Sequence, residues 1–203
     1  MLSNFISKFS AKASESNKIT TAVIDKAQIL EAVKFARDEM KFELLSDIAC
    51  VDNLNLNKSK RFSLYYIFSS LKGSNFIIQV DLDESESIAS VSQIYKSANW
   101  AERECYDQYG VKFANHPNLR RILNHKDFIG HPLRKDYPID KYQILTQSDS
   151  LVDEMRDQLL SLGLASEEND EFKIKYTFLN IGPSHPATHG TIRNFMALDG
   201  EKI

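Results

Sequence analysis

Residues 94–138 decide the fold of this chain, and they read IYKSANWAERECYDQYGVKFANHPNLRRILNHKDFIGHPLRKDYP. A helical pattern runs from Trp100 to Tyr109, and Gly110 is placed to end it, because glycine readily adopts the left-handed conformation that follows helices. Beyond Gly110 the regular pattern is broken by Pro117, Gly130, Pro132 and Pro138. We therefore expect residues 111–139 to form an extended, irregular segment, here called the strap, that runs over other surfaces.

Charged side chains are dense on both sides of that break. Arg103 stands four residues before Asp107, so a helix brings the two onto adjacent faces. Arginine binds carboxylates through paired hydrogen bonds and is the favoured cation of buried or interfacial ion pairs. The pattern predicts ion pairs that lock the strap onto a partner. We assign this structural or interface role to Glu102, Arg103, Glu104, Asp107, Arg120, Arg121, His131, Arg134, Lys135 and Asp136.

Two catalytic interpretations of the same residues fit less well. Paired carboxylates can do acid–base chemistry, but Glu102 and Glu104 are two residues apart and point to different sides of a helix. Histidines can bind a metal, but their arginine neighbours disfavour a cation at His116, His125 and His131. We therefore expect neither a catalytic residue nor a metal site in this stretch.

Upstream of this stretch the pattern alternates between helix and strand. Apolar spacing predicts a helix over residues 27–40, then a strand within 42–53 and a β-hairpin over 61–82. Ser87 is placed to cap a further helix that carries Ile88, Val91, Ile94 and Tyr95 on one side. These elements predict an α+β fold, in which a small mixed or antiparallel sheet has flanking helices.

The domain organisation follows from changes in composition along the chain. We expect a flexible N-terminus over residues 1–20 and an α/β domain over residues 21–140. An acidic linker with a short helix at 152–162 is predicted for residues 141–171. Residues 172–203 complete the chain with two predicted strands, which form a β-hairpin; these strands are 172–181 and 191–198.

Bulk composition excludes several classes of protein. The 42% hydrophobic and 26% charged content is typical of a soluble globular protein, and a net charge of -3 argues against a nucleic-acid partner. Two cysteines are too few for a disulfide framework or for the four thiolates of an iron–sulfur cluster. Since no apolar run approaches the ~20 residues of a membrane-spanning helix, membrane contact is expected only through partners.

A second motif lies in residues 180–203, which read NIGPSHPATHGTIRNFMALDGEKI. Its glycines and prolines predict a loop between the last two strands, from which His185 and His189 project. A third metal ligand is not nearby, which disfavours a metal site. The residues alone leave open whether these histidines are packing elements or act in chemistry.

The first motif resembles the signature of the C subunit of respiratory complex I. The resemblance implies a non-catalytic α/β module of the hydrophilic arm that binds no cofactor and packs against the D subunit. Iron–sulfur clusters and FMN are then held by partner proteins. Gln108 departs from the family, which usually carries an apolar residue there. The matching residues are Asn99-Trp100, Glu102-Arg103-Glu104, Asp107, Gly110, His116-Pro117, Leu119-Arg120-Arg121-Ile122-Leu123 and Gly130-His131-Pro132-Leu133-Arg134-Lys135-Asp136-Tyr137-Pro138.

The second motif, GPSHPATHG followed by an apolar strand and LDGE, resembles the start of the D subunit in fused C/D proteins. The resemblance implies a loop that lines the quinone cavity, in which His189 hydrogen-bonds a quinone carbonyl and His185 shapes the loop. Such a donor stabilises the charge that develops on oxygen during reduction, and imidazole titrates near the working pH. Most of the D subunit lies beyond these residues, so we expect a truncated chain that is inactive alone.

Together the two resemblances imply a peripheral-arm subunit of a proton-translocating NADH:quinone oxidoreductase. Its expected partners are quinone, the remainder of the D subunit, the protein with the terminal iron–sulfur cluster and neighbouring hydrophilic-arm subunits. The expected location is the cytoplasmic face of the bacterial inner membrane, or the mitochondrial matrix side if the lysine- and serine-containing N-terminus is a transit peptide. One alternative is a C/D-like subunit of a membrane-bound NiFe hydrogenase complex, whose Cys-x-x-Cys pairs would begin near or beyond residue 203 and which the intact HPATHG loop disfavours. The other is a non-catalytic assembly module.

Overall fold

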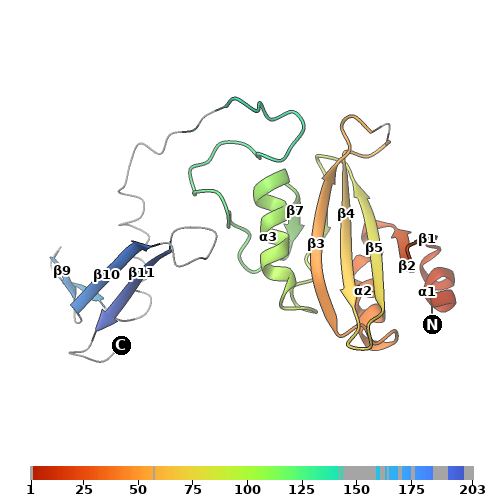
Figure 1. Cartoon of the computed structure of the whole chain (residues 1–203), viewed down its shortest axis with the longest axis horizontal. Coiled ribbons are helices and arrows are strands. Elements are labelled where there is room, and N and C mark those ends of the chain that lie inside the picture. The colour runs from red at the N-terminus through yellow and green to blue at the C-terminus, as the bar shows by residue number, and fades with distance from the viewer. Residues whose placement is uncertain are drawn as a thin grey trace. The chain divides into compact units, whose positions relative to one another are not determined.

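The computed structural model describes residues 2–56, 58–141, 143, 159–160, 163, 165–168, 171–174, 177–184 and 192–198. The chain divides into two compact units, Met1–Gln143 and Ile144–Ile203, and each is described by itself (Figure 1). Within the described residues, no helix has the length and apolar character needed to cross a membrane.

The first unit is built on a five-stranded mixed sheet. Its strand order is β1-β2-β5-β4-β3, with β2 and β5 parallel and the other neighbours antiparallel. On β5 the side chains at even positions from Phe76 to Leu82 are buried, as expected for a strand with one face in the core. The α+β fold and the mixed sheet are therefore confirmed. The strands are β1 (Lys12–Ser16), β2 (Ile19–Ile24), β3 (Leu44–Asp52), β4 (Phe62–Ser69) and β5 (Asn75–Leu82).

Three α-helices and one 3-10 turn accompany this sheet. They are α1 (Leu2–Phe9), η1 (Lys26–Gln28), α2 (Ile29–Asp38) and α3 (Ala98–Tyr109). Aromatic rings join two helices to the sheet, since Phe5 of α1 packs edge-on against Phe35 of α2 and Phe76 of β5. Helix α3 lies beside the edge strand β3 (Figure 1), where the Cys105 thiol donates to the Ile48 carbonyl at 3.1 Å. Gly110 ends α3 with φ +83°, as predicted.

Two parts of the first unit differ from the sequence-based expectation. The helix predicted after Ser87 is wrong: Ser87–Ala89 is a short strand, β6, which pairs in parallel with β7 (Lys112–Ala114), and turns follow it. Ile88 and Val91 are still buried, so the apolar spacing correctly indicates which side chains are buried but not that they lie on a helix. The N-terminal residues, expected to be flexible, form α1 and β1 because Phe5 and Phe9 anchor the helix in the core.

The second unit contains four described strands. These are β8 (Ala165–Glu168), β9 (Glu171–Ile174), β10 (Thr177–Ser184) and β11 (Ile192–Leu198). They form two antiparallel pairs, β8 with β9 and β10 with β11. The strand predicted over 172–181 is thus divided between β9 and β10. Most of the helix predicted at 152–162 lies outside the described residues.

Candidate functional site

Asp107, near the C-terminal end of α3, holds the strap against the helix. Its side chain has no exposed surface. Oδ2 accepts hydrogen bonds from three consecutive backbone N–H groups of the strap, those of Ile122, Leu123 and Asn124, at 3.0, 2.8 and 2.8 Å. Oδ1 accepts from Arg121 Nη1 at 2.6 Å and from the Asn124 side-chain amide at 3.0 Å. One carboxylate therefore fixes the path of a whole turn of the strap.

The charge state of Asp107 follows from these donors. Burial by itself raises the pKa of a carboxyl group, but the backbone and side-chain N–H groups of Asn124 and the Arg121 guanidinium act in the opposite direction. They hold the pKa of Asp107 at about 2. Asp107 is therefore a permanent anion near neutral pH and has no proton to exchange.

Two arginines extend this attachment on either side of Asp107. The Arg121 guanidinium also donates to the Phe128 and Gly130 carbonyls, both at 2.7 Å. These bonds join Arg121 to a part of the strap seven to nine residues further along the chain. Arg103, one turn earlier on α3, donates to the carbonyls of Arg120 and Arg121 at 3.0 and 2.8 Å. The expected pairing of Arg103 with Asp107 is replaced by these bonds, because each side chain turns toward the strap.

A second buried carboxylate holds the far end of the strap at the sheet. Asp52, the last residue of β3, is 2% exposed. Its Oδ2 accepts from the Lys135 backbone N–H at 2.8 Å and from Arg61 Nη2 at 2.9 Å. Arg61 Nη2 also lies 3.1 Å from Asp136 Oδ1, and Asp136 receives two bonds of 3.0 Å from Arg134. The sequence pattern did not point to Asp52 and Arg61, because both lie far from the strap along the chain.

Glu102 differs from the other carboxylates of α3 because no arginine or lysine pairs with it among the described residues. Its side chain is fully buried, with Oε2 accepting from Ser90 Oγ at 2.6 Å and Oε1 from the Val91 N–H at 2.7 Å. His116 Nε2 lies 3.8 Å from Oε2. Burial raises the pKa of Glu102 to about 7, although the bonds from Ser90 and Val91 lower it.

The remaining predicted residues have separate surroundings. His131 Nδ1 lies 3.0 Å from the Asp107 carbonyl, and Lys135 contributes its backbone N–H. Glu104 and Arg120 are exposed on α3 and the strap. Among the residues that the structure describes, no group of three or more His, Cys, Asp or Glu side chains is arranged to hold a metal ion. His185 and His189 lie outside the described residues.

The strap has some polar side chains turned inward, such as those of Arg121 and Asn124, and several apolar ones turned outward. Leu123, Ile129, Leu133 and Ile139 are all more than half exposed.

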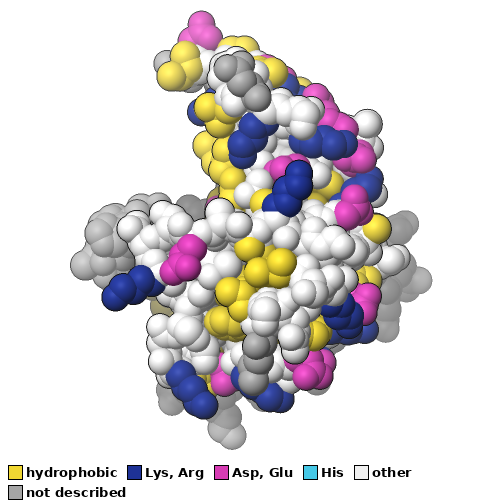
Figure 2. Space-filling view, turned by 90° about the vertical axis from the view of Figure 1, so that its right-hand side faces the viewer, with side chains coloured by type: hydrophobic (Ala, Val, Ile, Leu, Met, Phe, Trp, Pro, Cys, Tyr) yellow, Lys and Arg dark blue, Asp and Glu magenta, His cyan; other side chains and the backbone are white. Residues whose placement is uncertain are grey.

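Figure 2 draws a different face, the one that lies at the right of Figure 1. Basic and acidic side chains are interspersed on it, and no broad area of one sign is visible. This part of the surface therefore lacks the concentrated positive charge that nucleic acid requires.

Comparison with known proteins places this arrangement in a family. The family model for the respiratory-chain NADH dehydrogenase 30 kDa subunit matches residues 22–143. The chain belongs to this family. Its matched range takes in the second half of β2, α2, α3 and the entire strap, so the carboxylate–strap attachments lie within the family's own region.

Relatives of the 30 kDa subunit family extend the match over nearly the whole chain. The C/D subunit of NADH-quinone oxidoreductase from Bdellovibrio bacteriovorus is 39% identical over 198 residues, which is 93% of this chain and 33% of the relative. The protein of that name from Buchnera aphidicola subsp. Cinara cedri is 36% identical over 89% of this chain and 33% of the relative. The chain therefore spans about a third of the length of these relatives.

Two solved structures resemble the fold of this chain. A trypsin-resistant fragment of Nqo5 is 27% identical, has a TM-score of 0.54 and covers 58% of this chain and 96% of the fragment. A chain of the archaeal membrane-bound sulfane sulfur reductase is 18% identical, with a TM-score of 0.58 over 84% of this chain and 95% of that one. The second likeness concerns the fold alone.

Proposed function

We propose that this chain is the C part, joined to the beginning of a D part, of the fused C/D subunit of an NADH:quinone oxidoreductase. In this proposal unit Met1–Gln143 is a structural part of the peripheral arm and carries out no chemistry itself. The observation that supports a structural role is that the buried carboxylates are bonded to other parts of the same chain. Asp107 and Asp52 are engaged by backbone N–H groups of the strap and by arginines, so neither is free to act on a substrate.

The outward apolar residues of the strap support the docking role. A segment held by polar bonds on its inner side presents Leu123, Ile129 and Leu133 to its surroundings. Large apolar side chains that stay exposed along one segment are a common feature of protein interfaces. We assign this surface to the other hydrophilic-arm subunits, the remainder of the D part among them. Contact with the membrane is then made only through the assembled complex.

The proposed quinone chemistry lies in the second unit. The register of β10 and β11 sets Ser184 opposite Ile192, and the HPATHG segment joins these two positions. We propose that His189 donates a hydrogen bond to a quinone carbonyl from this connection, while His185 shapes it. The support is the sequence motif together with its position between two paired strands. Electrons would reach the quinone from iron–sulfur clusters and FMN of partner proteins.

The test uses the full-length subunit within the complete membrane complex of its host. Asp107→Asn is expected to reduce the amount of assembled complex without changing the turnover of each complex that does assemble. His189→Ala is expected to leave assembly unchanged and to lower quinone reduction by about 100-fold, the usual loss for one stabilising donor. NADH oxidation by an artificial acceptor, which takes electrons before the quinone, should remain at the parental rate in His189→Ala.

Asp127→Asn is the matched control for the first variant, because Asp127 is an exposed carboxylate on the same strap. The structural role is wrong if Asp107→Asn assembles fully and turns over slowly. The quinone role is wrong if His189→Ala assembles fully and reduces quinone at the parental rate.

A further inference from the structure

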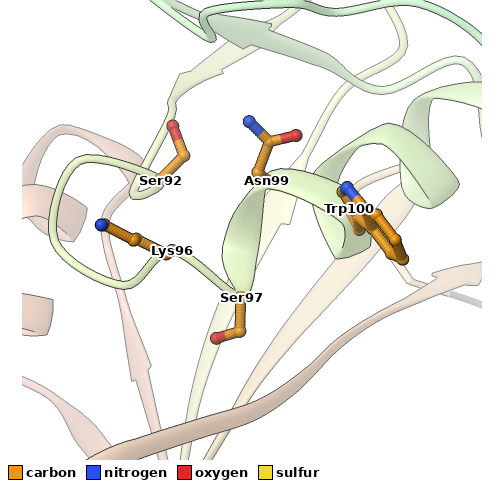
Figure 3. Close-up of a pocket in the computed structure, with 5 residues that line it drawn as sticks. All are labelled: Ser92, Lys96, Ser97, Asn99 and Trp100. Carbon is orange, nitrogen blue, oxygen red and sulfur yellow. The ribbon is translucent and has the colours of Figure 1, made fainter. Parts of the chain in front are cut away.

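A surface depression of about 530 Å³ lies where the turn after β6 meets the start of α3. Ser92, Lys96, Ser97, Asn99 and Trp100 line it (Figure 3). The view shows the hydroxyl of Ser92 and the amide of Asn99 on one side, and the Ser97 hydroxyl pointing the other way. Ser92 is 8% exposed, so its hydroxyl lies at the boundary between the depression and the interior.

From Ser92 a continuous line of hydrogen bonds leads inward. Ser92 Oγ lies 2.7 Å from Ser90 Oγ, where either hydroxyl can donate. Ser90 Oγ in turn lies 2.6 Å from Glu102 Oε2. Two hydroxyl oxygens in sequence thus connect a fully buried carboxyl group with the depression. Because hydroxyl groups both donate and accept, the line can be oriented in either direction.

Among the described residues, no lysine or arginine pairs with the carboxylate of Glu102. The titratable groups that face it are His116 from the segment after β7, Tyr66 from β4 and Cys105 from its own helix. His116 Nδ1 accepts the Asn118 N–H at 3.0 Å and Nε2 lies 3.0 Å from the Asn99 carbonyl, so both ring nitrogens are engaged by the backbone. Burial raises the pKa of both Tyr66 and Cys105, so these two groups are neutral near pH 7.

We propose that Glu102 is a proton-binding site that exchanges its proton with solvent in the depression through the hydroxyls of Ser90 and Ser92. On release, the Oε2–H bond of Glu102 breaks and a new O–H bond forms at Ser90. The proton of Ser90 passes to Ser92, and the proton of Ser92 passes to water in the depression. One proton leaves, the carboxylate remains, and the two hydroxyl groups end with reversed orientation.

The energetics of the two states agree with this assignment. In the acid form Glu102 donates to Ser90 and needs no counter-ion, which suits a position that no lysine or arginine pairs with among the described residues. In the ionised form it accepts from Ser90 and from the Val91 N–H, whose bonds are already in place. Burial and these two bonds act in opposite directions and leave the pKa of Glu102 at about 7. Both states are therefore populated near neutral pH.

The test follows the carboxyl group of Glu102 by infrared difference spectroscopy on the complete chain. We expect the carbonyl stretch of a buried carboxylic acid to disappear as pH rises, with a midpoint near 7. Glu102→Gln should abolish this signal. Glu104→Gln, which removes an exposed carboxyl group from the same helix, should leave it unchanged. If Glu102 gives the signal of the acid form, or of the ionised form, unchanged from about pH 5 to 8, the proposed site is wrong.

The route of the proton is tested by relaxation of the same signal after a rapid pH jump. Ser92→Ala keeps the titrating group but interrupts the hydroxyl line at the depression, so relaxation should slow on the order of tenfold. Ser97→Ala is the matched control, since Ser97 lines the same depression and its hydroxyl donates instead to the Leu45 carbonyl at 2.9 Å. Relaxation of Ser92→Ala at the parental rate overturns the relay.

Discussion

Arg121 Nη1 donates to Asp107 Oδ1 at 2.6 Å, and this ion pair is enclosed by the strap segment that it holds. The same guanidinium reaches the Phe128 and Gly130 carbonyls, while Oδ2 accepts three N–H groups. An ion pair that carries this many further hydrogen bonds is costly to break, because either partner left alone is a largely buried, uncompensated charge. The attachment of the strap thus depends on two residues at once.

Asp107→Asn is expected to lower the free energy of unfolding by about 3 kcal/mol, since it leaves the Arg121 guanidinium without its carboxylate. Urea unfolding of the complete chain measures this change. Asp127→Asn makes the same substitution at an exposed carboxylate and should change stability by less than about 0.5 kcal/mol. Equal effects of the two variants would show that the Asp107 bonds add nothing beyond removal of a surface charge.

Arg103→Lys is expected to lower stability by about 1 kcal/mol, because a lysine cannot reproduce the two bonds that the guanidinium makes to consecutive carbonyls. Arg120→Lys is the matched control, since Arg120 is exposed and contributes its carbonyl to this contact rather than its side chain. Thermal unfolding of both variants gives the comparison. A fully stable Arg103→Lys would mean that positive charge alone is sufficient at this position.

Gly110→Ala tests how closely the strap approaches the end of α3. A Cβ atom at Gly110 would lie 2.7 Å from His131 Nε2, whose ring is held by the Asp107 carbonyl. Gly73→Ala controls for backbone strain, since Gly73 has φ +84° with no atom within 4 Å of the added Cβ. We expect Gly73→Ala to cost about 1 kcal/mol and Gly110→Ala to cost more. Equal losses would place the His131 ring away from Gly110.

Glu102 predicts an unusual dependence of stability on pH. Its pKa rises from an ordinary 4.5 to about 7 in the folded chain, so the folded state binds the proton more tightly than the unfolded one. The associated stability is fully present below about pH 4.5 and is lost as pH rises through about 7, a change of about 3 kcal/mol. Urea unfolding at several pH values should show this decline in the parent and not in Glu102→Gln. A parallel pH profile in the variant would contradict the assignment.

Local patterns were sufficient for the elements whose period is clear. The strands of the hairpin, helix α2 and the end of α3 at Gly110 lie where alternation, apolar spacing and glycine predict them. The segment after Ser87 was mispredicted because Ile88 and Val91 are buried from a strand and a turn, at a spacing that also suits a helix. Helix α1 could have been predicted from Phe5 and Phe9, which stand at positions i and i+4 and therefore share one helical face.

The charged residues of the site were predicted as a group, but their partners were not. Asp107 and Arg121 are fourteen residues apart, and their pairing depends on the path of a strap without helix or strand over residues 115–139. Asp52 meets the Lys135 N–H across a sequence separation of 83 residues, which no local pattern can report. The sequence predicted ion pairs between the strap and a partner. The bonds that the structure shows are made within the chain itself.

The inward-facing polar side chains of the strap fix its shape before any neighbour meets it. Ordering a residue costs roughly 1–2 kcal/mol of backbone entropy, and here the folding of the first unit meets that cost. The outward Leu123, Ile129 and Leu133 therefore present a rigid surface. A preorganised surface loses little freedom on contact, so its affinity depends on the fit between shapes. We therefore expect a partner to dock onto this surface as a preformed shape and not to fold together with it.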